Sequence, residues 1–285
     1  MPGRDILIGI DAGTSVIKAV AFDLSGQQIA ASSVPNRYHS GADGAATQSL
    51  AQTWDDCAAA LRGLGAKVEG LATRTAALSV TAQGDGTWLV GSGGPVGDAW
   101  LWLDARAAPT VARLARGGAN RARFEATGTG LNTCQQGSQM AHMDAHAPDL
   151  LDRAEVALHC KDWLYLNLTG VRATDPSEAS FTFGNFRTRQ YDDTVIEALG
   201  LTHRRNLLPP IIDGRDKSCF AVTEPNTGLN TTQLKTRAVR QGDKYIVNGQ
   251  KVWISTAQVA NKILLLARTT PLEEVRSPTH GLSLF

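Results

Sequence analysis

The sequence lacks several features that would define its class. It has no apolar run approaching the ~20 residues that a membrane-spanning helix needs. Its first residues, 1–5, pass directly into a predicted strand and leave no room for a signal peptide. The four cysteines lie far apart, with no CxxC pair and no companion pair of histidines, which argues against a zinc site and a disulfide framework. These absences predict a cytoplasmic protein that does not contact membranes.

The net charge is also small, at +1, but it conceals an asymmetry along the chain. Residues 1–216 carry 19 basic and 23 acidic side chains, whereas residues 217–285 carry 9 basic and 4 acidic ones. A step of this kind marks a change of module. Because the basic residues of the second part are interleaved with predicted strands rather than clustered, nucleic acid is not expected as a partner.

Residues 6–23 (ILIGIDAGTSVIKAVAFD) organise the first part of the chain. Two apolar, β-branched runs predict a pair of buried strands, Ile6–Ile10 and Val16–Phe22. The five residues between them include one glycine, which suits a hairpin loop. Gly13 permits a positive φ at this bend and leaves no Cβ between the backbone and a bound group.

The polar side chains at this bend are typical of a phosphate site. Thr14 and Ser15 offer backbone N–H and hydroxyl donors in a concave corner. Asp11 is placed to hold Mg²⁺ directly or through water, because that ion prefers one or two carboxylates together with phosphate oxygens. Lys18 adds a positive charge just beyond the bend. The alternative is an ordinary hairpin whose polar residues satisfy the turn.

A second polar loop follows a later strand. Apolar spacing predicts a helix over Ser49–Leu64, and a β-branched run predicts a strand over Thr75–Thr81. Ligands gather outside the carboxyl ends of strands in open α/β sheets. Gln83 and Asp85 of the following loop are therefore candidate substrate contacts, with a solvated turn as the alternative.

Residues 100–106 (WLWLDAR) form the other informative stretch of this part. Alternation predicts an extended segment with Trp100, Trp102 and Asp104 on one face. Aromatic surface beside a carboxylate and an arginine suits a sugar, because the ring stacks and the charged groups hydrogen-bond hydroxyls. The alternative is a core strand with a surface pair between Asp104 and Arg106.

Together these motifs resemble a known family. The D-x-G-T-S-x-x-K pattern between two strands is similar to the first phosphate motif of the actin-like ATPases, and the string through Gly26 resembles the start of the FGGY carbohydrate kinases. Trp102 and Asp104 match the W-x-D-x-R element beside the sugar pocket of that family. Residues 83–86 match its sugar-contact loop. Gly84-Asp85 replaces the Arg-Glu of glycerol kinases and the Met-His of xylulokinases, which favours the erythritol-like branch.

The resemblance extends through the next segment. Apolar residues at helical spacing predict a helix over Leu150–Leu168, with Lys161 and Asp162 on its exposed side. Residues 173–180 (ATDPSEAS) then resemble the T-D-x-S-x-A-S element of the xylulokinase branch, which implies that Asp175 contacts the substrate. The resemblance covers roughly residues 4–213.

This resemblance implies both a fold and a chemistry. The implied fold is an α/β actin-like, ribonuclease H-like ATPase domain, a mixed sheet with flanking helices, and the implied chemistry is phosphorylation of a sugar or polyol hydroxyl with Mg-ATP. The family's general-base aspartate lies in a Gly-Gly-Asp element and its adenine pocket in a second lobe. Neither is found in this sequence, so we assign no catalytic residue and expect weak or absent catalysis.

From Cys219 onward the pattern changes to β. Asn248-Gly249 is a strong signal for a hairpin between strands at 244–247 and 250–254, because a type I′ turn needs positive φ at both positions. The last strand start, 281–285, has no predicted partner, and an unpaired edge of this kind favours self-association. The predicted fold is a small antiparallel β-meander that also contains these strands: Thr236–Arg240 and Ile263–Ala267.

Two strings here resemble the middle β-domain of the acyl-CoA dehydrogenases, residues 220–228 (FAVTEPNTG) and 245–255 (YIVNGQKVWIS). In that family the first string lines the pocket for flavin and acyl-CoA, and the second packs on the isoalloxazine. The alternative is a β-hairpin with a core tryptophan. The resemblance implies these FAD contacts: Phe220, Val222, Thr223, Gly228, Trp253, Ile254 and Ser255.

The sequence therefore predicts an incomplete FGGY kinase N-terminal domain at 1–213, a junction at 214–217 and a partial acyl-CoA dehydrogenase middle domain at 218–285. A carbohydrate kinase acting on an erythritol- or xylulose-like substrate is the main interpretation. The alternatives are an FAD-dependent acyl-CoA dehydrogenase fragment, with acyl-CoA as its partner, and a non-catalytic fusion product.

Overall fold

The computed structural model of the chain describes residues 3–212, 218–227, 230–254, 257, 260 and 262–285. The chain divides into two compact units, Met1–Ile212 (unit 1) and Asp213–Phe285 (unit 2). None of the helices in these described ranges is long and apolar enough to cross a membrane.

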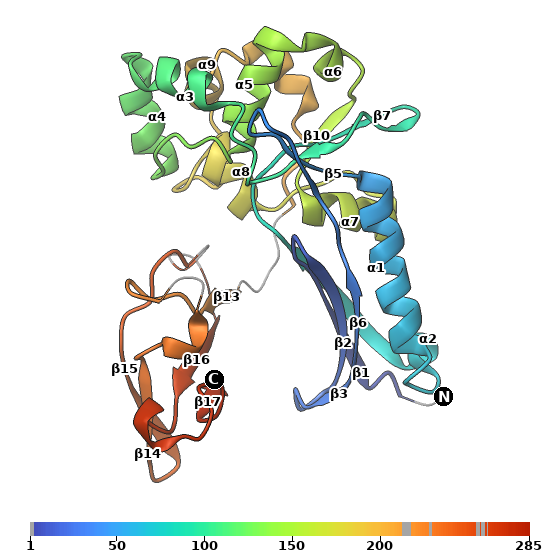
Figure 1. Cartoon of the computed structure of the whole chain (residues 1–285), viewed down its shortest axis with the longest axis vertical. Coiled ribbons are helices and arrows are strands. Elements are labelled where there is room, and N and C mark those ends of the chain that lie inside the picture. Colours follow the sequence, from blue (N-terminus) through green and yellow to red (C-terminus); the bar gives the residue numbers. More distant parts are fainter. Residues whose placement is uncertain (1–2, 213–217, 228–229, 255–256, 258–259, 261) are drawn as a thin grey trace. The chain divides into compact units, whose positions relative to one another are not determined.

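Unit 1 is built on a four-stranded sheet of order β3-β2-β1-β6. The strand β1 (Ile6–Ala12) pairs antiparallel with β2 (Val16–Asp23) and parallel with β6 (Thr75–Ala82), so the sheet is mixed, as expected. Alternate residues of β1 are buried because α1 (Leu50–Gly65) and α7 (Cys160–Thr169) pack on that face of the sheet (Figure 1). The helix α1 begins where the Ser49 side chain accepts a hydrogen bond from the Gln52 N–H.

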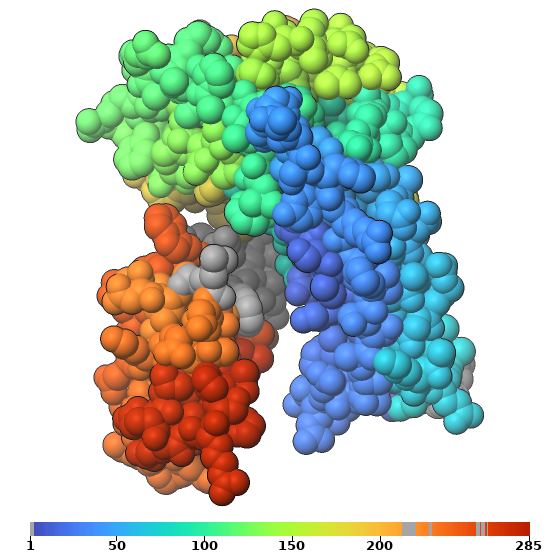
Figure 2. Space-filling model, viewed as in Figure 1, coloured from blue at the N-terminus to red at the C-terminus, as the bar shows by residue number. Residues whose placement is uncertain are grey.

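The remaining helices of unit 1 surround a second apolar core. Met140, Phe183 and Leu199 are buried in it, and they come from α5 (Gln136–His146), the end of α8 (Pro176–Thr182) and the end of α9 (Asp193–Ala198). Figure 2 shows the helices α3–α6, in green to yellow-green, gathered at one end of this unit. The other elements of unit 1 are β3 (Gln28–Pro35), β4 (His39–Ser40), β5 (Ala46–Gln48), α2 (Leu71–Arg74), β7 (Trp88–Gly91), β8 (Gly94–Pro95), β9 (Ala99–Trp100), α3 (Ala108–Ala115), α4 (Ala119–Thr127), α6 (Pro148–Asp152), β10 (Val156–Leu158), β11 (Gly184–Asn185), β12 (Gln190–Tyr191) and η1 (Thr202–Leu207).

One helix predicted for unit 1 is wrong. The predicted helix over Leu150–Leu168 is in fact α6, which ends at Asp152, then the strand β10, and then α7. The interruption arises because residues 156–158 are buried and pair with β7, which satisfies their backbone groups outside a helix. Lys161 and Asp162, predicted to be exposed, are largely buried in an ion pair with a separation of 2.7 Å.

Unit 2 is a mixed sheet rather than the predicted antiparallel meander. The strand β16 (Lys262–Arg268) runs parallel to β13 (Ser218–Ala221) and to β14 (Arg237–Gln241). It runs antiparallel to β17 (Leu282–Leu284), so the strand expected to be unpaired at the end of the sequence has a partner. The other elements of unit 2 are β15 (Lys244–Asn248), η2 (Thr231–Gln233) and η3 (Leu272–Glu274).

The predicted Asn248-Gly249 hairpin is also absent, whereas the turn at Gly242-Asp243 is present between β14 and β15. No strand forms over residues 250–254. Gly249 serves close packing instead, since a Cβ on it would lie 2.7 Å or less from the backbone and side chain of Thr236. A glycine needed for close approach carries the same local sequence signal as one needed for a turn.

A buried carboxylate holds the segments of unit 2 together. Glu224 accepts hydrogen bonds from the backbone N–H groups of Lys235 (2.7 Å) and Thr236 (2.8 Å). It also forms an ion pair with the Lys251 Nζ at 3.0 Å. Burial alone would raise the pKa of Glu224, but the hydrogen bonds that it accepts lower that pKa to about 2.

We expect the stability of unit 2 to fall in acid because of Glu224. A carboxyl group whose folded-state pKa is depressed from 4.5 to about 2 stabilises the fold above pH 4.5, and that stabilisation is lost as the pH falls toward 2. Glu224→Gln should destabilise unit 2 at neutral pH by roughly 1–2 kcal/mol and flatten the acid dependence. Amide hydrogen exchange in β14, followed from pH 6 to pH 3, measures both effects. An unchanged pH profile in the variant would contradict the assignment.

Candidate functional site

Two polar loops of unit 1 lie together at one edge of the sheet. Because β1 and β6 are parallel and Ala12 pairs with Ala82, their carboxyl ends meet there. The Gln83 N–H donates to the Ala12 carbonyl at 2.9 Å and continues the pairing into the loops. A cleft of about 480 Å³ opens at this edge, and its lining residues are Asp11, Gly13, Thr14, Ala82, Gln83, Gly84, Asp85 and Trp102.

A chain of hydrogen bonds joins three of the predicted site residues. The Trp102 Nε1–H donates to Thr14 Oγ1 at 3.0 Å, and that hydroxyl donates to Gln83 Oε1, also at 3.0 Å. The Gln83 amide then donates to Gln48 Oε1 at 2.7 Å. The structure therefore brings together residues that lie up to 88 positions apart in the sequence.

The bend after β1 is fixed by its backbone rather than by an unusual φ at Gly13. Gly13 is not among the positive-φ glycines, which corrects the expectation for this position. Its N–H donates to the Val16 carbonyl at 3.0 Å, and its carbonyl accepts from Asn36 Nδ2 at 2.9 Å. A Cβ at Gly13 would lie only 3.1 Å from the Val16 carbonyl oxygen, so a side chain here would crowd the bend.

The charged residues predicted beside this bend lie on the open face of the sheet. Asp11 and Lys18 are directly opposite each other in the β1–β2 register, and both are exposed. Asp11 lines the cleft, whereas Lys18 and the exposed Ser15 are not among its lining residues.

Asp85 presents an unusual carboxylate to the cleft. Its backbone has a φ of 56°, and its Oδ2 accepts a hydrogen bond from the Cys134 thiol at 3.1 Å. Its Oδ1 is buried and has no hydrogen-bond partner within the described part of the chain. Burial raises the pKa of Asp85, while the Cys134 bond and the charge of His159 only partly oppose that rise. Asp85 therefore has one buried acceptor oxygen that no described residue satisfies.

Asp104 lies apart from the cleft lining. Its side chain is fully buried, accepts the Ala46 N–H at 2.9 Å and forms an ion pair with the Arg106 guanidinium at 2.5 Å. Arg106 in turn covers the Trp100 ring at 3.5 Å.

The predicted single face of residues 100–106 is wrong, because β9 ends at Trp100 and the Asp104 N–H bonds back to the Leu101 carbonyl. This turn leaves Trp100 buried while Trp102 is 44% exposed.

Asp175 also lies outside the cleft lining. It begins α8 by accepting the backbone N–H groups of Ser177 and Glu178, and it pairs with Lys161 Nζ at 2.8 Å. Lys161 joins it to Asp162, whose pKa burial would raise but Lys161 and the neighbouring histidine lower to about 2. Asp175 is thus the half-exposed end of an ionic cluster that connects the start of α7 to the start of α8.

Sequence reasoning missed three residues that shape the cleft. Cys134 caps Asp85, Gln48 holds Gln83, and His159 lies close enough to Asp85 to affect its pKa. An isolated cysteine and an isolated glutamine carry no motif, so no local pattern marks the first two. His159 follows a strand that pairs with the residues just beyond the Asp85 loop, and only the correct strand assignment reveals this proximity.

The described residues that resemble a flavin site come together in unit 2. The Val252 N–H donates to the Thr223 carbonyl at 3.0 Å, and Lys251 Nζ donates to the Val222 carbonyl at 2.9 Å. Trp253 is 88% exposed and has a φ of 58°. Ile254 follows it and is partly buried. The predicted contacts at Gly228 and Ser255, and the side chain of Phe220, lie outside what the structure describes.

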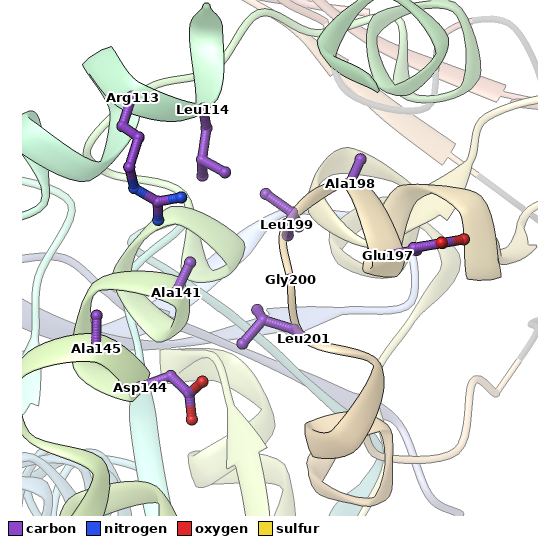
Figure 3. Close-up of a pocket in the computed structure, with 10 residues that line it drawn as sticks. All are labelled: Arg113, Leu114, Ala141, Asp144, Ala145, Glu197, Ala198, Leu199, Gly200 and Leu201. Carbon is purple, nitrogen blue, oxygen red and sulfur yellow. The ribbon is translucent and has the colours of Figure 1, made fainter. Parts of the chain in front are cut away.

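A second cavity of unit 1 lies between α3, α5 and the end of α9, with a volume of about 320 Å³ (Figure 3). The Asp144 carboxylate on its wall is already paired with Arg204 at 2.7 Å and His203 at 3.0 Å. Glu197 points away from the cavity, while the Arg113 guanidinium reaches into the space between the helices. None of the residues predicted for function lines it.

No group of three or more metal-ligating side chains is found among the residues that the structure describes. A magnesium ion bound with a nucleotide needs fewer, because phosphate oxygens and water complete its shell. Asp11, exposed at the cleft beside the N–H groups of the bend, fits such an ion.

Solved structures share the fold of unit 1. Xylulose kinase from Rhodospirillum rubrum matches 74% of this chain with a TM-score of 0.69 at 21% identity, and the match covers 43% of that kinase. Plasmodium falciparum glycerol kinase with ADP matches 76% of the chain with a TM-score of 0.64 at 20% identity, covering 44% of that structure. The fold is therefore the actin-like α/β fold of these sugar and polyol kinases.

The N-terminal domain of the FGGY family of carbohydrate kinases matches residues 6–231, and the chain belongs to this family. Erythritol kinase of Brucella abortus is 79% identical over 211 residues, which are 74% of this chain and 41% of that enzyme. L-xylulose/3-keto-L-gulonate kinase of Escherichia coli is 26% identical over 234 residues, or 81% of this chain and 47% of the kinase. The chain thus spans less than half the length of these relatives.

A second match covers the end of the chain. The middle domain of acyl-CoA dehydrogenases matches residues 219–285. Acyl-CoA dehydrogenase FadE26 of Mycobacterium tuberculosis is 38% identical over 81 residues, which are 28% of this chain and 20% of that protein. Both predicted family resemblances are confirmed.

Removal of the Thr14 hydroxyl should break the hydrogen-bond chain that joins Trp102 to Gln83. Thr14→Val should destabilise unit 1 by about 1 kcal/mol, because Trp102 and Gln83 both lose a partner. The indole N–H resonance of Trp102 should move toward its solvent-exposed position. Ser15→Ala is the matched control, since no described residue forms a hydrogen bond with the side chain of this exposed neighbour. Equal effects of the two variants on stability and on the indole resonance would contradict the role of Thr14 in this hydrogen-bond chain.

Proposed function

We propose that the cleft of unit 1 is the polyol- and phosphate-binding half of an erythritol-type kinase that works with Mg-ATP in the cytoplasm. The observation that carries the proposal is the buried, unpartnered Oδ1 of Asp85 at the cleft. An oxygen of this kind is satisfied by a donor such as a polyol hydroxyl. The 79% identity to an erythritol kinase supports erythritol as the first polyol to test.

The loop around Asp85 suits a small, hydroxyl-rich molecule. A Cβ on Gly84 would meet open space, so this position leaves room in the cleft that a longer side chain would fill. Gln83 and the exposed Trp102 indole lie beside it and offer a polar and an aromatic surface. Asp104 and Asp175 contribute by holding this region in place, and we do not propose them as direct contacts.

The bend after β1 supplies the phosphate side of the proposal. Asp11 would hold Mg²⁺, and the backbone N–H groups of Thr14 and Ser15 together with the Ser15 hydroxyl would face phosphate oxygens, with Lys18 adding positive charge. When bound, the metal neutralises charge that develops on the transferred phosphoryl group. Gly13 keeps the bend compact enough for this approach.

We propose phosphoryl transfer only for a protein that also contains the part of the relatives that this chain does not match. We propose that the functional segments are residues 1–213 and 218–285, joined at 214–217.

We expect erythritol to perturb the amide resonances around Gly84 and Asp85 and Mg-ATP to perturb those of Gly13 and Thr14. Asp85→Asn keeps the side-chain shape but replaces one of the two acceptor oxygens with an NH₂ group. It should therefore weaken erythritol binding about tenfold or more and leave the Mg-ATP response intact. Asp11→Asn should show the reverse pattern. Chemical-shift titrations of the full chain measure both.

The two variants serve as controls for each other, and glucitol, a longer polyol, controls for the size of the cleft. If neither ligand shifts any cleft resonance at millimolar concentration, the proposal fails. Loss of both responses in either variant would indicate a folding defect, which the thermal unfolding curve of that variant detects.

A second candidate function, flavin binding by unit 2, is favoured by the hydrogen bond that joins Val252 to Thr223. This bond places the two strings that resemble a flavin site side by side and leaves the Trp253 indole exposed. Acyl-CoA would be the partner in that case. The candidate rests on described residues alone, namely Val222, Thr223, Trp253 and Ile254.

We expect added FAD to quench the fluorescence of Trp253, because stacking on an isoalloxazine brings the two rings into contact. The five other tryptophans belong to unit 1, so the difference between the parent chain and Trp253→Phe isolates this signal. Trp102→Phe is the matched control, because it removes a half-exposed indole from unit 1. A difference signal that FAD leaves unchanged would exclude the flavin site.

A further inference from the structure

The strand β15 forms an open edge of the unit 2 sheet. The sheet order places β15 outside β14, and no other strand of the described ranges pairs with it (Figure 1). All five of its residues are exposed, although three of them, Tyr245, Ile246 and Val247, are large and apolar. An edge of this composition is a template for pairing with another strand.

The register of the hairpin shows which backbone groups of β15 are unpaired. A two-residue turn with Gly242 at positive φ makes the flanking pair, Gln241 and Lys244, a hydrogen-bonded one. Hydrogen-bonded pairs then alternate along an antiparallel ladder, so Ile246 and Asn248 also face β14.

The N–H and C=O groups of Tyr245 and Val247 therefore point away from the sheet. The neighbouring strand agrees, since the Thr236 carbonyl is turned toward β16, where it accepts the Arg268 N–H at 2.8 Å.

The usual protections of an edge strand are missing from β15. It contains no proline and no bulge in its pairing with β14, and its one charged residue, Lys244, lies at the end beside the turn. Natural edges instead carry central charges, prolines or bulges that block a second strand. The chemistry of β15 therefore favours pairing rather than preventing it.

We propose that two copies of this chain pair antiparallel through β15, with the two-fold axis at Ile246. This register places the outward groups of Tyr245 opposite those of Val247 of the second copy, so each such pair exchanges two backbone hydrogen bonds. Ile246 then faces its own copy in a non-hydrogen-bonded pair, as its inward groups already serve β14.

The side chains also favour a register with the two-fold axis at Ile246. Tyr245 and Val247 form an aromatic and β-branched pair, a combination that stabilises antiparallel strands. Lys244 falls opposite Asn248 of the second copy, so no like charges meet. The Tyr245 ring is also held in place by an edge contact with Phe285, whose ring centre lies 4.8 Å away. A second copy is thus a better fit than a strand with acidic or basic residues at its centre.

Sedimentation velocity of the full chain over a range of concentrations tests the pairing. We expect a monomer–dimer equilibrium that Val247→Pro weakens by about tenfold or more, because proline removes an outward N–H without breaking the β14 ladder. Ile246→Lys should act similarly by placing two like charges at the axis. Val239→Lys is the matched control, since Val239 is 42% exposed on β14 and neighbours Ile246, which is 45% exposed.

Amide hydrogen exchange provides a second readout that does not depend on any variant folding. The Tyr245 and Val247 amides should exchange more slowly as the concentration rises, whereas exchange of the Ile246 amide should change little. A chain that stays monomeric throughout would overturn the proposal. So would a dimer that Val239→Lys disrupts while Val247→Pro and Ile246→Lys leave it intact, because that pattern indicates stacking of sheet faces.

Discussion

The parallel pairing of β1 with β6 is the constraint on which the candidate site depends. These strands are separated by more than 60 residues, yet their register brings the bend after Ala12 against the loop after Ala82. The Gln83 N–H bond to the Ala12 carbonyl extends that pairing by one step. Every later contact of the cleft, including those of Thr14, Trp102 and Asp85, is possible because these two chain segments leave the sheet at the same edge.

Much of this arrangement was predictable from local pattern. The β-branched runs of β1, β2 and β6, the helix α1 and the polar loop at 83–86 all follow from periodicity and turn chemistry. The family resemblances added the order of these motifs, and both were confirmed by comparison with known proteins. The roles assigned to individual site residues stay predictions, because only ligand binding tests them.

The failures have a common physical origin in long-range contacts. Lys161 and Asp162 read as a solvated helix face, but the carboxylate of Asp175 and a neighbouring histidine compensate their burial. Asp104 was predicted to share one face of an extended segment with Trp100 and Trp102, but a turn after Trp100 directs it into the protein against Arg106. Gly249 read as a turn glycine, but it lies against Thr236, which leaves no room for a Cβ. No window of neighbouring residues contains this information.

The hydrogen-bond chain beside the cleft has a fixed polarity. Backbone carbonyls can only accept, so those of Thr14 and Arg37 hold the NH₂ of Gln48 and leave its Oε1 to accept from Gln83. Because Gln83 turns its NH₂ toward Gln48, its Oε1 faces Thr14, whose hydroxyl donates to it and accepts the Trp102 indole N–H. Two backbone carbonyls thereby set the orientation of two side-chain amides and of one hydroxyl proton. The Thr14 hydroxyl is left with a spare lone pair rather than a spare proton, which suits a hydroxyl or a metal-bound water of an incoming molecule better than an anionic oxygen.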